Sequence, residues 1–150
     1  MSLQSQIMDA MKAAMKSKDS RALEALRAIK SEILLAQSAS GASEGLSDKE
    51  EIAILSKLVK QRKDSAAIFT EQGREDLATP ELEQVAVISQ FLPEQLSEEE
   101  IAAKIDAIIA QTGANSMKDM GKVMGMANGQ MAGKADGKTI AMLVKAKLSN

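Results

Sequence analysis

The residues of this sequence with the clearest chemical potential are lysines near the end of the chain. Residues 113–150 contain six Lys and two acidic residues, whereas residues 1–112 contain 13 Lys or Arg and 19 Asp or Glu. A basic segment that follows an acidic body favours an anionic partner, such as nucleic acid, for that segment. Lysines on a solvated helix face also keep a helix soluble, so the charge pattern leaves both interpretations open.

The residue types that are absent exclude several chemistries. The 150 residues include no Cys, His, Trp or Tyr and only two Phe. A disulfide, a Cys/His zinc site and any mechanism that uses a His base are therefore excluded within this chain. We expect no catalytic residue, no metal and no cofactor. The lack of aromatic residues also disfavours RNA recognition by base stacking, which leaves contact between Lys or Arg and phosphates.

The segment Gly133–Thr139 ends in Gly-Lys-Thr and superficially resembles a phosphate-binding loop. Three residues separate Gly133 from the Gly137-Lys138 pair, whereas the phosphate loop has four at this place and follows a strand. The better interpretation is a glycine-rich turn before a helix that Asp136 caps. Lys134 and Lys138 would then lie beside free helix amides and could hold an isolated phosphate.

A second candidate site lies in the long helix that we expect between Ser47 and Gln72. Its apolar residues recur every three or four positions, and Arg62 falls on this apolar seam. An arginine there must extend its stem to solvent, or find a carboxylate or backbone carbonyls. We expect a structural role or a possible ligand site for the charged residues of this region, namely Arg62, Asp64, Arg74 and Asp76.

Apolar residues at helical spacing occur along most of the chain, and no convincing strand pattern occurs. Ser47 with Glu50, and again Ser97 with Glu100, have the spacing of a capping box at a helix start. We also expect a loop of small residues at 38–43 and a helix that starts at Thr79-Pro80.

These signals predict an all-α protein with two domains. The first, residues 1–92, is expected to be a bundle of helical hairpins with about four helices. The second, residues 97–150, is expected to be a small three-helix domain that follows the break at Phe91-Leu92-Pro93.

Nothing in the sequence predicts association with a membrane. The longest uninterrupted apolar stretch has five residues, 140–144, whereas a membrane-spanning helix needs about 20. The first six residues contain no apolar run of the kind that a signal peptide has. We expect a cytoplasmic protein, and the oligomeric state stays open.

Five short motifs, in order along the chain, resemble the YqeY family. They are KQRKDS at 60–65, GREDL at 73–77, FLPEQLSEEEI at 91–101, DMGKVMG at 119–125 and GKADG at 133–137. The resemblance covers essentially the whole chain. Phe91 departs from the family pattern, in which a Tyr is usual at this position, and the change removes a hydroxyl.

The resemblance implies a two-part helical protein. Its C-terminal part is similar to the tail domain of the GatB subunit of the tRNA-dependent amidotransferase, where the tail is regarded as a tRNA-contacting module and the amide chemistry takes place elsewhere. By this likeness the phosphate contacts would be Lys118, Lys122, Lys134 and Lys138. Proteins of this kind sometimes carry a transferred term for carbon–nitrogen ligase activity with glutamine as the amide donor.

Three functions are compatible with these observations. The first is a non-catalytic accessory protein that contacts tRNA, or a tRNA-dependent amidotransferase or synthetase, through a basic C-terminal domain. The second is a glutamine-dependent ligase, for which the sequence offers no Cys nucleophile and no Lys next to the serines of 38–43. The third is a helical scaffold for a protein partner, with the second and third helices paired as a hairpin.

Overall fold

The computed structural model describes residues 2–41 and 45–149, and every regular element in these ranges is a helix. The prediction of an all-α protein is confirmed for this part of the chain. Residues that are close in space group the chain into two compact units, residues 1–92 and 93–150. The described elements are α1 (Leu3–Ser17), α2 (Ser20–Ser40), α3 (Asp48–Glu71), α4 (Glu75–Ser89), α5 (Glu98–Thr112), the 3-10 helix η1 (Met117–Asp119), α6 (Met120–Gln130) and α7 (Gly137–Leu148).

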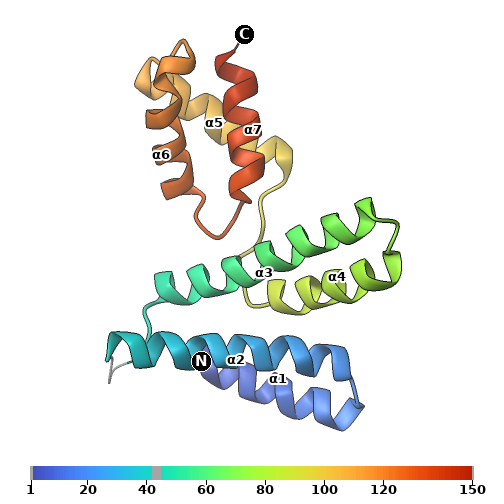
Figure 1. Ribbon diagram of the computed structural model, residues 1–150. Helices are drawn as coiled ribbons and strands as arrows, with labels where there is room; N and C mark the ends of the chain where they lie inside the picture. The colour runs from blue at the N-terminus through green and yellow to red at the C-terminus, as the bar shows by residue number, and fades with distance from the viewer. Residues whose placement is uncertain (1, 42–44, 150) are drawn as a thin grey trace. The chain divides into compact units, whose positions relative to one another are not determined.

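The first unit consists of two helical hairpins, α1 with α2 and α3 with α4 (Figure 1). The hairpins meet mainly where α2 packs against α4, so the chief partners of α2 are α1 and α4. The scaffold interpretation paired α2 with α3 as a hairpin, and the structure instead pairs α2 with α1. Their shared core is aliphatic, and its largest fully buried side chains are Ile7, Leu26, Ile29, Leu55 and Ile88.

Helix ends in the first unit follow capping chemistry. Lys18 ends α1 in the left-handed conformation, with φ of 59°, and the Asp19 side chain accepts from the backbone N–H of Ala22 to cap α2. At the start of α3 the Glu50 N–H donates to Ser47 Oγ at 3.2 Å, and the Ser47 N–H donates to Glu50 Oε2 at 2.7 Å. This reciprocal pair confirms the capping box expected from the sequence.

Two boundaries in the first unit differ from the expectation. Helix α2 continues to Ser40 and ends at Gly41, so the small-residue loop starts later than residue 38; residues 42–44 lie outside the described residues. Helix α4 begins at Glu75 and encloses Pro80, so the prediction of a start at Pro80 is wrong. The acidic side chains of Glu75 and Asp76 favour a helix N-terminus at this earlier place, because they complement the helix dipole.

The second unit packs α5, α6 and α7 around one small core (Figure 1). Methionine fills part of this core. Met131 is fully buried, and the partly buried Met120 and Met124 pack against the core. The Glu100 N–H donates to Ser97 Oγ at 3.2 Å at the start of α5, and the Ser97 hydroxyl donates to Glu100 Oε1 at 3.1 Å. Ser97 therefore caps α5, although the second bond differs from that of a full capping box.

The length and polarity of the helices decide whether any of them could span a membrane. Over residues 2–41 and 45–149, each helix is too short or too polar to cross a lipid bilayer.

Candidate nucleic-acid interface

The four lysines that sequence analysis selects lie in two pairs around α6. Lys118 is in η1 and Lys122 is in the first turn of α6, whereas Lys134 follows the end of α6 and Lys138 is in the first turn of α7. The eleven residues of α6 extend about 16 Å at the usual rise per residue. The structure thus separates the lysines into two groups, one at each end of this helix.

All four lysine side chains are exposed to solvent. Within residues 2–41 and 45–149, no carboxylate lies within ion-pair distance of Lys118, Lys122 or Lys134. Lys147 differs, since its ammonium lies 2.7 Å from Asp106 Oδ1. Three of the selected lysines therefore carry positive charge that no neighbouring acid in the described structure pairs directly.

Helix α6 presents Lys122 on the side away from the core. Val123, Ala127 and Met131 recur every four residues and are buried, and a helix turns about 100° per residue. This spacing places Lys122 opposite the buried face. Three exposed glycines share the outer side of α6, and a Cβ added at any of them would meet no atom within 4 Å: Gly121, Gly125 and Gly129. Packing within this unit does not explain these glycines.

The environment of Lys134 is less favourable for an anion. Lys134 lines a cavity of about 390 Å³ together with Glu94, Gln95, Leu96 and Glu100. One backbone and one side-chain hydrogen bond fix this arrangement, because the Leu96 N–H donates to the Lys134 carbonyl at 2.8 Å and Gln95 Nε2 donates to the Gly133 carbonyl at 2.6 Å. Two carboxylates thus share the cavity with Lys134 and oppose a phosphate there.

The charge of the whole second unit corrects one expectation. Residues 93–150 contain seven Lys and seven Asp or Glu, so the unit as a whole is neutral and not basic. The acids concentrate in the segment that includes α5, which has Glu98, Glu99 and Glu100 in its first turn. The positive charge belongs to η1, α6, α7 and the loops that join them.

Arg62, the cation on the apolar seam of α3, is half-buried and hydrogen-bonded. Its Nε donates to Gln84 Oε1 at 2.7 Å, and its Nη1 donates to the Leu58 carbonyl at 3.1 Å. Gln84 Nε2 in turn donates to Glu24 Oε2 at 3.1 Å. One chain of hydrogen bonds therefore joins α3, α4 and α2. The sequence left solvent, a carboxylate and backbone carbonyls open as surroundings of Arg62, and it gave no signal for Gln84 or Glu24, which are distant in sequence.

The other candidates of the first unit form local pairs. Lys60 Nζ lies 2.8 Å from Asp64 Oδ2, one turn away on α3. Arg74 donates from Nε and Nη2 to the two carboxylate oxygens of Asp76, at 3.0 and 2.9 Å. These hydrogen bonds raise the pKa of Arg74 and lower the pKa of Asp76. The exposed Arg74–Asp76 pair shares no hydrogen bond with the half-buried Arg62, so the structure does not join these residues in one site.

A metal centre has no support in the described residues. In residues 2–41 and 45–149, no three acidic side chains gather in a way that could hold a metal ion.

The fold and the lysines define the class: an all-helical protein whose second unit exposes lysines around a short, glycine-rich helix, and three of them, Lys118, Lys122 and Lys134, have no ion-pair partner in the described residues. A family model described as Yqey-like protein matches residues 4–148. The chain therefore belongs to the YqeY family, which confirms the resemblance of the five motifs. No curated protein matches the chain.

Proposed function

We propose that this protein is a non-catalytic accessory protein that binds tRNA through the lysines at the two ends of α6. The observation that carries this proposal is that Lys118, Lys122 and Lys134 are exposed, with no carboxylate at ion-pair distance in the described residues. Polyanion binding uses such cations, because neutralised phosphates release their condensed counterions. The absence of Cys and His from the sequence supports a binding role over glutamine hydrolysis.

The geometry suits contact with the nucleic-acid backbone more than with bases. Two lysine groups separated by the length of α6 can contact phosphates on separate parts of one folded RNA. Lysine contacts to phosphate position a protein without reading sequence. We therefore expect binding that depends strongly on salt and differs little between individual tRNAs.

The two ends of α6 contribute unequally in this proposal. Glu94 and Glu100 line the cavity of Lys134 and disfavour a phosphate at that end. The acid next to Lys118 in sequence is Asp119, whose carboxylate accepts from the Asn115 N–H at 3.2 Å. The Lys118 end of α6 is thus the stronger phosphate contact.

A titration of the full-length protein with total tRNA at two salt concentrations tests the proposal. The double variant Lys118→Gln/Lys122→Gln should weaken binding and reduce the slope of log K against log salt by about 1.4 to 1.8 for two lost phosphate contacts. A matched control, Lys12→Gln/Lys30→Gln, makes the same charge change on exposed positions of α1 and α2. Equal losses in both variants, or no binding of the parent protein at low salt, would contradict the proposal.

One observation favours a protein partner as the second candidate. Leu34 and Leu35 on α2 are 47% and 64% exposed, whereas Leu26, Ile29 and Ile33 of the same helix are buried. Adjacent exposed leucines are a common feature of protein contact surfaces. Recovery of one stoichiometric protein from RNase-treated lysate, lost in the variant Leu35→Lys, would favour this scaffold function.

A further inference from the structure

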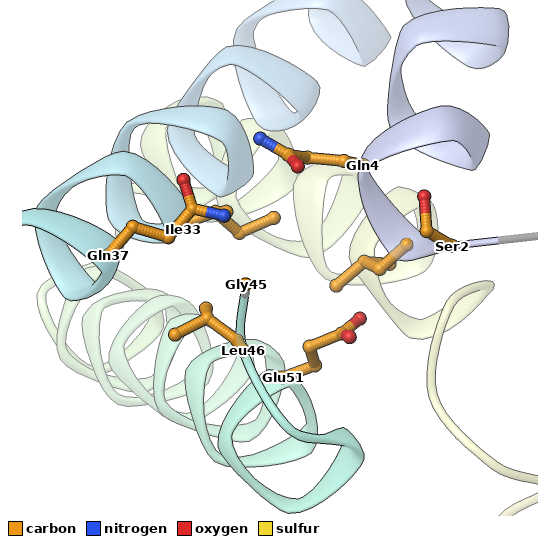
Figure 2. Close-up of a pocket in the computed structure, with 8 residues that line it drawn as sticks. Ser2, Gln4, Ile33, Gln37, Gly45, Leu46 and Glu51 are labelled. Atoms are coloured by element: carbon orange, nitrogen blue, oxygen red, sulfur yellow. The ribbon is translucent and has the colours of Figure 1, made fainter. Parts of the chain in front are cut away.

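A separate cavity in the first unit has the features of a small-molecule site. It has a volume of about 170 Å³ and lies where the start of α1, the C-terminal half of α2 and the start of α3 meet (Figure 2). A cavity of about 150 Å³ can hold benzene. This one therefore has room for a ligand of about six non-hydrogen atoms.

The lining of this cavity is divided into an apolar and a polar part. Leu3 is 8% exposed and Ile33 is 2% exposed, and Leu46 packs against the same core. Figure 2 shows the Gln4 and Gln37 side chains on α1 and α2, and Glu51 on α3, around the same space. The remaining lining residues are Ser2 and Gly45. Glu51 is the one ionisable side chain among the lining residues.

Glu51 has no cationic partner in the described structure. In the described ranges, no Lys or Arg nitrogen comes within 4.0 Å of its carboxylate. Desolvation, with the charge of Asp48 as the smaller cause, raises the pKa of Glu51 above its ordinary value. A cation placed in the cavity would favour the ionised form of Glu51 and so offset both effects.

The dipoles of the helix ends around the cavity do not reverse the preference for a cation that Glu51 creates. The positive end of α3 already has a capping box and three acidic residues in its first turn. The negative end of α2 has no basic residue in its last turn. At the start of α1 the Ser2 side chain already accepts from the Ser5 N–H at 3.2 Å, and the negative end of the neighbouring α2 opposes the remaining positive potential of that helix end. The ionised form of Glu51 therefore determines the charge of the ligand.

We propose that this cavity binds a small primary aliphatic amine in its ammonium form. The alkyl chain lies on Leu3, Ile33 and Leu46, and the ammonium donates to the Glu51 carboxylate. The amide oxygen of Gln4, which also lines the cavity, provides a further acceptor. This site is independent of the lysines around α6, so either proposal can fail alone.

The test is an NMR titration of the full-length protein with n-pentylammonium chloride at neutral pH. We expect saturable shifts of the backbone amides of Leu3, Ile33 and Leu46. The variant Glu51→Gln should weaken the affinity about tenfold, since a charge-assisted hydrogen bond is lost. The matched control Asp48→Asn removes a neighbouring charge that does not line the cavity and should bind the amine within about twofold of the parent.

Two neutral or anionic probes of the same length sharpen the test. 1-Pentanol and pentanoate should bind at least about tenfold more weakly than the amine. Equal binding of 1-pentanol would overturn the proposal, because the cavity would then be a purely apolar site. No saturable shift with the amine, or unchanged affinity in a folded Glu51→Gln variant, would overturn it as well.

Discussion

The two units use their basic residues in opposite ways. In the first unit, arginine side chains join helices: Arg21 contacts Glu83 at 3.2 Å, and Arg62 reaches Gln84. In the second unit, Lys118, Lys122 and Lys134 are exposed and have no ion-pair partner in the described residues, whereas Lys147 pairs with Asp106. A planar guanidinium suits fixed, multiple contacts, whereas an ammonium is a hydrated point charge. The comparison separates cations that hold the fold from cations that are available to a partner.

The largest expected effect tests whether the two units are separate in stability. Ile105 is fully buried in the second core, and Ile105→Ala should cost about 2–5 kcal/mol of unfolding free energy. Hydrogen exchange should show lost protection in α5, α6 and α7 and little change in α1 to α4. The variant Ile29→Ala provides the mirror control in the first core. Equal loss of protection in both units would mean that they unfold as one.

The next effect compares the two kinds of cation directly. Arg62→Met keeps an aliphatic stem but removes the donor to Gln84 Oε1 and the second donor to the Leu58 carbonyl, and it should cost about 1–3 kcal/mol. Lys122→Met should change stability by less than about 0.5 kcal/mol. Denaturant unfolding measures both values. A costly Lys122→Met would show that this lysine belongs to the fold and would weaken the tRNA proposal.

A smaller effect of opposite sign is expected on the outer face of α6. Gly125→Ala should stabilise the protein by about 0.5–1 kcal/mol, because alanine is the better helix former and its Cβ meets no atom within 4 Å. Thermal unfolding provides the measurement, with Gly113→Ala as the control. Gly113 has φ of +70°, so alanine there should destabilise. A destabilising Gly125→Ala would reveal a packing role that the structure does not contain.

The smallest effect is a pH dependence of opposite sign for two adjacent acids. Hydrogen bonds to the backbone N–H and hydroxyl of Ser47 lower the pKa of Glu50, so its contribution is present above the ordinary pKa and is lost as the pH falls through the folded value. The pKa of Glu51 is raised by desolvation and Asp48, so stability decreases as the pH rises from the ordinary to the raised value.

Substitution separates these two contributions. At neutral pH, Glu50→Gln should destabilise the protein slightly and Glu51→Gln should stabilise it slightly, whereas in strong acid both differences should shrink. Chemical denaturation at the two pH values checks this. Equal signs for the two variants at neutral pH would contradict the assignment.

Local features of the fold were predictable from the sequence, and features that join distant segments were not. The spacing of apolar residues predicted the helices. The Ser47–Glu50 capping box predicted the start of α3, because both of its partners lie within four consecutive residues. The start of α4 was misplaced because Pro80 is a strong local signal that the helix tolerates.

The candidate sites show the same limit. The lysines were found from composition, but their division between the ends of α6 required the actual helix bounds. The Arg62–Gln84 contact spans 22 positions in sequence. The cavity at Glu51 combines three segments, and no spacing rule connects them. Tertiary packing alone creates such arrangements.

The bonds from Gln95 and Leu96 to the loop after α6 determine where the second unit can be excised for protein chemistry. A fragment that began at residue 97 would remove the donors to the Gly133 and Lys134 carbonyls and open one wall of the cavity beside them. The glycine-rich loop would then lose its brace, and the orientation of the Lys134 backbone would change. An excised form that retains Pro93 and the residues after it keeps this brace.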